Sequence, residues 1–181
     1  MWRDEQAKEL LAARDQYIDQ ASAALQPVIQ TYPRILLLGS DLATRVVLQA
    51  ENVTAGLLKE IGFDVVQPEG MDASADISWE RVPQIETDII VVLDWNDDRF
   101  MKADAPRREK WAQKPILNAM PIFQQGRVFF ADYYLWANHI RGPLSERIIL
   151  EALPELLLPT VAEELAADGP ATVEQTAHPS A

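Results

Sequence analysis

Three uninterrupted apolar runs constrain the fold of this chain more than any other feature. They span residues 35–38, 89–93 and 128–131, and each is followed at once by a glycine or an aspartate. Strands that are apolar on both faces are typical of parallel sheets covered by helices on each side. Helical patterns lie between the runs, so the sequence predicts an α/β fold with a three-layer, mostly parallel sheet.

The remaining elements follow from local patterns. Apolar residues recur at helical spacing from about residue 3 to residue 30 and predict a long amphipathic helix that bends or ends near Pro27. Gly62 is placed to end a helix at 53–61, before a short strand at 63–66. Further helices are predicted for residues 79–82, where Ser78 would cap, and for 106–111, 115–124 and 143–159.

The chain therefore divides into three parts. Residues 1–30 form the long helix, residues 31–159 form one α/β lobe, and residues 160–181 form a short helix and a disordered tail with too few apolar residues to pack. A length of 181 residues suits one domain with a full core.

Charge and composition exclude several classes of function. A net charge of -12 disfavours nonspecific binding to nucleic acid or to anionic membranes. The absence of cysteine excludes disulfides, thiolate zinc sites and cysteine nucleophiles, and it fits either the cytoplasm or an exported protein. The sequence has no apolar run of about 18 residues and does not open like an export signal, so we expect a soluble chain, or a mature piece of a longer one.

Aromatic and polar residues follow the predicted strands. Gly39, Ser40 and Asp41 follow the first long strand, the third is followed by Asp94-Trp95-Asn96, and the fourth by Asp132-Tyr133-Tyr134-Leu135-Trp136. Ligands of open α/β sheets bind at the carboxyl ends of the strands. Aromatic rings beside hydrogen-bonding groups suit a surface that stacks on a flat or apolar ligand. We therefore expect a binding face at this edge.

Six segments in this order resemble one protein family: "AKELLAARDQY", "RILLLGSD", "NVTAGLLKEIGFDVV", "ISWERVPQIETDIIVVL", "GRVFFADYYLW" and "RGPLSERIILEAL". Together they are similar to the C-terminal lobe of the ferric-siderophore and cobalamin class of ABC-transporter substrate-binding proteins. The resemblance runs from the first helix to about Pro159. It implies a two-lobe protein with an interlobe helix, a ligand held between the lobes, and an N-terminal lobe in cis or in trans. It further implies an ABC permease as partner and a periplasmic or cell-surface location.

The resemblance implies a docking role for Glu80, because in this family a glutamate in the segment matching "ISWER" docks against arginines of the permease. An acid in the first turn of a helix is also favoured by the helix dipole and stays exposed. Glu80 therefore has two interpretations, a permease contact or an ordinary first-turn acid.

For the ligand, the resemblance implies contacts from the loops at 40–45, 94–97 and 132–141. Stacking and polar contacts are expected from Trp95, Asn96, Tyr134 and Trp136, and charge pairing with an anionic iron chelate from Arg45 and Arg141. Two alternatives stay open. Trp136 could belong to the core, and Arg141 could pair with a surface acid.

No intrinsic metal site or cofactor is expected. His139 is one of two histidines, and a single histidine without convergent donors is not a metal site. The chelator would supply the iron ligands, although Tyr133 or Tyr134 stays open as a direct ligand.

Two other classes of function were considered. A receiver-like signalling domain would accept a phosphoryl group at Asp94, but the first strand is followed by one acid, Asp41, and no lysine follows Lys114. A nucleotide-binding enzyme would need a glycine-rich loop, which "GSDLATR" does not provide. We therefore expect a binding protein and not an enzyme.

Overall fold

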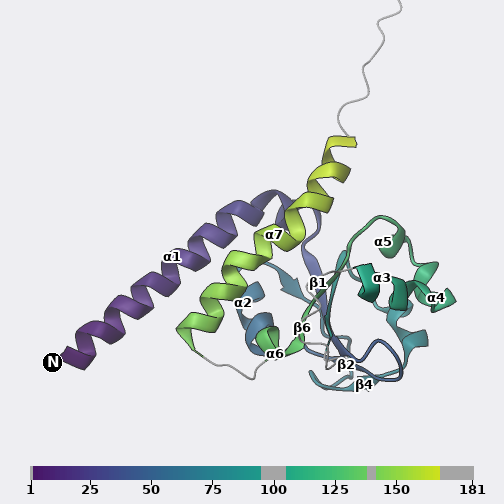
Figure 1. Ribbon diagram of the computed structural model, residues 1–181, viewed down its shortest axis with the longest axis horizontal. Coiled ribbons are helices and arrows are strands. Elements are labelled where there is room, and N and C mark those ends of the chain that lie inside the picture. The colour runs from purple at the N-terminus through teal and green to yellow at the C-terminus, as the bar shows by residue number, and fades with distance from the viewer. Residues whose placement is uncertain (1, 95–104, 138–141, 168–181) are drawn as a thin grey trace, which may run out of the picture.

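The computed structural model describes residues 2–94, 105–137 and 142–167, and these form a sheet between two layers of helices (Figure 1). The helices are α1 (Trp2–Thr31), α2 (Val53–Ile61), the 3-10 helix η1 (Trp79–Gln84), α3 (Ala105–Ala112), α4 (Pro115–Asn118), α5 (Pro121–Gln124), α6 (Tyr133–Trp136) and α7 (Pro143–Ala167). The strands are β1 (Arg34–Ser40), β2 (Val46–Leu48), β3 (Asp64–Val65), β4 (Asp76–Ile77), β5 (Ile89–Asp94) and β6 (Val128–Asp132).

The sheet has the order β4-β2-β1-β5-β6, and β3 pairs with the beginning of β1. β1, β5 and β6 run parallel, and β3 is parallel to β1. β2 runs antiparallel to the end of β1, and β4 runs antiparallel to β2. The prediction of a mostly parallel sheet between helices is therefore confirmed.

The core lies around the two central strands. Every residue of β5 is buried, and so are residues 35–40 of β1, which agrees with the two-faced burial inferred from their apolar runs. Helices α1, α2 and α7 contact one another on one side of the sheet, and η1, α3, α4 and α5 form the layer on the other side (Figure 1).

Helix α2 forms as its sequence indicates. The side chain of Asn52 accepts a hydrogen bond from the backbone N–H of Ala55, which caps the first turn. Gly62 ends the helix in the left-handed region, with φ of 113°, where a residue with a side chain is strained. The expected bounds and cap are confirmed.

Helix α1 is anchored at its middle and its carboxyl end. It continues through Pro27 to Thr31 and buries Ala21, Leu25 and Val28. The guanidinium of Arg14 contacts Glu146 of α7 and, at 2.8 Å, Glu60 of α2. The amino-terminal turns project beyond the rest of the lobe (Figure 1).

Several elements differ from the sequence prediction. The short strands β2 and β4 and the single-turn helix α6 were not predicted. The closing helix does not stop at Pro159 but runs without a break through Pro154 and Pro159 to Ala167, so no separate helix begins at residue 160. The turn at Trp79 is a 3-10 helix, and the side chain of Ser78 does not cap it. Two one-turn helices, α4 and α5, replace the expected helix at 115–124.

Among the residues that the structure describes, no helix combines the length and the apolar character needed to cross a membrane.

Candidate functional site

The candidate site lies at the carboxyl edge of the sheet. Strand register places Ser40 of β1 beside Asp94 of β5, and Asp94 beside Asp132 of β6. The loops that follow these strands therefore begin side by side, as expected for the ligand edge of an α/β sheet.

The turn after β1 begins at a buried hydroxyl. Ser40 Oγ accepts a hydrogen bond from the backbone N–H of Leu42 and donates one to the carbonyl oxygen of Arg45, each at 2.8 Å. Leu42 has a φ of 57°, an uncommon conformation for a residue with a side chain. Ser40 therefore joins the two ends of the turn.

Asp41 completes the turn from the solvent side. Its Oδ1 accepts hydrogen bonds from the three successive N–H groups of residues 43–45, at 2.8, 2.8 and 3.0 Å. Its Oδ2 accepts one from the hydroxyl of Thr44 at 2.7 Å. Burial opposes ionisation, but these hydrogen bonds together lower the pKa of Asp41 to about 2. Hydrogen bonds among its own residues thus hold the turn.

Arg45 stands at the end of this turn and is exposed to solvent. Its guanidinium forms a two-point contact with Asp76 of β4, with Nε and Nη2 at 2.7 and 3.2 Å from the carboxylate oxygens. This contact is the main reason that the pKa of Arg45 is raised, and the nearby Tyr133 adds to it. An anionic ligand at Arg45 would therefore compete with Asp76.

Helix α6 follows β6 and contributes aromatic residues. Asp132 Oδ1 caps it by accepting a hydrogen bond from the N–H of Leu135 at 2.8 Å. Tyr133 and Tyr134 are half-buried, and their rings meet edge to face with centroids 6.1 Å apart. Trp136 is only 5% exposed and belongs to the core, and its carbonyl oxygen accepts the hydroxyl of Thr54.

Tyr133 also lines a hollow of about 420 Å³ at this edge. The other lining residues come from the end of β2, the start of α2, the loop before β4 and the end of α6: Leu48, Gln49, Glu51, Asn52, Ala73, Ser74 and Ala137. Sequence reasoning considered Tyr133 only as a possible iron ligand and did not predict this hollow, because its walls come from segments far apart in the chain.

Asp94 is buried in an ion pair. Its side chain is 3% exposed, and its Oδ2 lies 3.0 Å from Nε of Arg107, which is 10% exposed. A receiver-type aspartate must be accessible to a phosphoryl donor, so the structure argues against that alternative. The pair joins the end of β5 to α3.

Glu80 is exposed in the first turn of η1. Its own backbone N–H, the Ser78 hydroxyl and, to a smaller extent, the Lys114 ammonium lower its pKa. Lys114 also donates a hydrogen bond to the carbonyl oxygen of Ala43 at 2.8 Å, so Glu80 lies near the turn after β1. Among the described residues, no group of three or more potential ligands could hold a metal ion.

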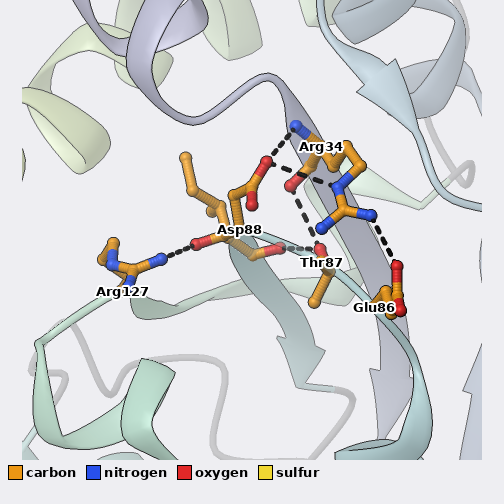
Figure 2. Close-up of polar contacts among 6 residues, drawn as sticks. Arg34, Glu86, Thr87, Asp88 and Arg127 are labelled. Carbon is orange, nitrogen blue, oxygen red and sulfur yellow. Dashed lines mark hydrogen bonds and ion pairs between the residues drawn. The ribbon is translucent and has the colours of Figure 1, made fainter.

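The opposite, amino edge of the sheet has a larger hollow, of about 480 Å³. Figure 2 shows the polar contacts beside it, which tie the beginnings of β1, β5 and β6 together. Arg34 contacts both Glu86 and Asp88, and Arg127 donates to the carbonyl oxygen of Asp88 at 2.6 Å. The Thr87 hydroxyl donates to the carbonyl oxygen of Arg34 at 3.1 Å. These charged groups are engaged in holding strands, which is a structural role.

Several solved structures are similar in fold to this chain. A periplasmic solute-binding protein from Mycobacterium smegmatis matches 90% of this chain with a TM-score of 0.63 and 18% identity. FhuD from Vibrio cholerae, bound to Fe³⁺-Desferal, matches 85% with a TM-score of 0.62 and 20% identity. A FhuD-fold binding protein of a Fep/Fec-like ferrichrome ABC transporter from Bacillus subtilis matches 83% with a TM-score of 0.64 and 15% identity.

The fold is that of one lobe of a periplasmic binding protein. The chain spans about half of these structures, covering 52%, 55% and 56% of them respectively. No protein-family model matches the sequence, and no curated protein sequence does so either. The expected resemblance is confirmed at the level of fold.

The structure brings only part of the predicted site together. Arg45 and Tyr134 lie at the carboxyl edge and are accessible. The ring of Trp136 is in the core, which is the alternative considered for it. Trp95, Asn96, His139 and Arg141 lie outside the described residues, so their predicted roles stay predictions.

Proposed function

We propose that this chain is the C-terminal lobe of the substrate-binding component of an ABC importer, and that it binds a ferric siderophore or a related iron chelate. The main support is the exposed guanidinium of Arg45 on a turn that its own hydrogen bonds hold in place. A prefolded contact avoids the entropy cost of ordering a loop on binding. The solved relatives include one bound to Fe³⁺-Desferal and one described as part of a ferrichrome transporter.

Charge supports the choice of Arg45 as a ligand contact. A chain with a net charge of -12 repels an anionic chelate unless cationic groups lie locally at the site. Arg45 is such a group, and we propose Arg141 as a second. The ligand would displace Asp76 from the guanidinium, and the rings of Tyr134, Tyr133 and Trp95 would contact its apolar parts, with Asn96 adding hydrogen bonds.

We propose that Glu80 docks the lobe on the permease. Its side chain is exposed, and its pKa is lowered further below neutral, so it carries a negative charge. A protruding carboxylate of this kind is complementary to an arginine of a partner protein. The location that follows from this function is the periplasm or the cell surface, and no nucleic-acid partner is expected.

A second α/β lobe, in cis or in trans, would complete the ligand site. Leu10 and Leu11 of α1 are 54% and 59% exposed, and Leu144 of α7 is 68% exposed. A groove of about 190 Å³ runs between these two helices and is lined in part by Leu10, Tyr17 and Leu144. Apolar side chains gathered around a groove are typical of a surface that another protein unit covers.

The experiment that tests the function is a titration of the chain with ferric hydroxamate and catecholate chelates and with cobalamin, followed by tryptophan fluorescence. We expect saturable quenching by an iron chelate, with weak affinity because one lobe offers half of the contacts. Arg45→Gln should weaken binding about tenfold or more, as expected for loss of a charged contact.

Arg147→Gln is the matched control, since Arg147 is an exposed arginine on α7 that pairs with Glu151, and it should bind like the unmodified chain. Absence of saturable binding to every chelate at millimolar concentration would refute the proposal. Equal affinities of the two variants would remove Arg45 from the site.

A further inference from the structure

Lys114 connects the two parts of the candidate site. It lies between α3 and α4, and its Nζ donates a hydrogen bond to the carbonyl oxygen of Ala43 in the turn after β1, at 2.8 Å. The same Nζ lies 4.8 Å from the ring centroid of Trp79, the first residue of η1. Trp79 is adjacent to Glu80 in the chain, so one ammonium group contacts the ligand-side turn and the helix that presents the docking residue.

The backbone of Lys114 is held firmly. Its N–H donates to the carbonyl oxygen of Trp111 at 3.1 Å, and its own carbonyl oxygen accepts from Leu117 and Asn118 at 3.0 and 2.9 Å. Because the Cα position is fixed in this way, motion of the lysine is confined to its side chain. The ammonium therefore responds to changes in the groups that surround it.

Trp79 is held on the other side by the core. Its ring meets that of Trp111 edge to face, with centroids 5.8 Å apart, and Trp111 is fully buried. The start of η1 thus lies between a fixed aromatic contact and the lysine ammonium. A cation over an indole face is an attractive contact, and it weakens when the cation moves away.

We propose that Lys114 is a positioning residue that couples the turn at residues 40–45 to Glu80. When the Ala43 carbonyl moves, the ammonium loses an acceptor and shifts relative to the Trp79 ring and the Glu80 carboxylate. The biological meaning of this coupling, a docking residue that senses an occupied ligand turn, rests on the function proposed above. The coupling itself does not require a ligand.

The lowered pKa of Glu80 supports this geometry, because the Lys114 ammonium contributes to it alongside the Ser78 hydroxyl and the backbone N–H of Glu80. A two-site coupling of this kind needs a group whose position both sites influence. Lys114 contacts the turn at Ala43 and the Trp79 ring beside Glu80, and its charge acts on the Glu80 carboxylate. Within the turn, Asp41 accepts hydrogen bonds from residues 43–45, and Arg45 pairs with Asp76 of β4.

The test uses the full chain labelled with 5-fluorotryptophan, and the Trp79 resonance is assigned with Trp79→Phe. Ser40→Ala disturbs the turn without a change in charge, because Ser40 Oγ bridges Leu42 and Arg45. In the unmodified background we expect it to shift the Trp79 resonance and to raise the pKa of Glu80, measured by carboxyl-carbon NMR. In a Lys114→Met background neither quantity should change when Ser40→Ala is added.

Lys59→Met is the matched control. The Nζ of Lys59 also donates to a backbone carbonyl, that of Ala50, but in the opposite helix layer, so this variant should transmit the effect of Ser40→Ala in full. Unchanged resonances of the other tryptophans show that each variant is folded. Equal shifts with and without Lys114, or no shift in either background, would overturn the coupling. Neither result depends on chelate binding. A failure of the chain to bind any chelate would refute the proposed function but not the coupling.

Discussion

The buried ion pair between Asp94 and Arg107 allows a quantitative test of how the end of β5 is held against α3. We consider Arg107→Met, which keeps most of the side-chain volume and removes the charge. The Asp94 carboxylate would then remain buried, at 3% exposure, without the Arg107 guanidinium 3.0 Å from it. Removal of one member of a buried pair costs about 3 to 5 kcal/mol.

The expected change in thermal stability follows from the size of the domain. For a chain of this length each kcal/mol lowers Tm by about 2 to 4 °C, so Arg107→Met should lower it by about 6 to 20 °C. Urea unfolding followed by circular dichroism measures the free energy directly, and an unchanged m-value shows that the unfolded state is comparable.

Two further variants separate the charge from the packing. Asp94→Asn combined with Arg107→Met should be more stable than Arg107→Met alone, because the charge of the buried carboxylate is removed together with the guanidinium. Arg147→Met removes the same kind of side chain from a pair with Glu151, in which both side chains are 49% exposed, and it should cost less than about 1 kcal/mol.

Two results would refute the reasoning. A cost of less than about 1 kcal/mol for Arg107→Met would mean that water reaches the Asp94 carboxylate and replaces the arginine. A double variant no more stable than Arg107→Met would mean that the buried charge is not the source of the loss.

Three other predictions concern Glu80 and Asp41 near the carboxyl edge of the sheet and the exposed apolar groove between α1 and α7. Glu80→Arg should leave Tm unchanged but abolish uptake in a reassembled transporter, whereas Glu86→Arg, which changes an exposed acid at the amino edge, should not; normal uptake by Glu80→Arg would rule out docking. Leu144→Glu should leave the fold intact and weaken association with a second lobe in analytical ultracentrifugation, and self-association of the unmodified chain that this variant abolishes would instead identify a second copy as the occupant. Because the folded pKa of Asp41 is about 2, below its unfolded value of about 3.9, its stabilising effect is present above pH 4 and is lost as the pH falls toward 2. Asp41→Asn should therefore flatten the pH dependence of unfolding between pH 4 and 2, and identical profiles would show that the turn does not depend on the charge.

Much of the fold could be predicted, because its main elements are encoded locally. The runs in β1, β5 and β6 are apolar on both faces, and only a sheet covered on both sides buries them. Asn52 and Gly62 mark the two ends of α2 through their own conformational preferences. The short strands β2 and β4 lacked such a signal, since two or three residues have no period, and each becomes a strand only by pairing with its neighbour.

The candidate site was less predictable than the fold. The rule that ligands meet the carboxyl ends of strands placed Tyr134 at that edge, and the family resemblance placed Arg45 there. It did not reveal that Arg45 is already paired with Asp76, or that Tyr133 borders a hollow. Trp136 follows the same strand as Tyr134, but the path of α6 turns its ring into the core.

By itself the sequence determined which segments are buried and where α2 begins and ends, because burial and capping depend on residues close together in the chain. The tertiary structure decided which side chains meet: Arg45 with Asp76, Arg14 with Glu60 and Glu146, and Lys114 with Ala43 and Trp79. These contacts join residues far apart in the chain, and their geometry exists only once the sheet and both helix layers have packed.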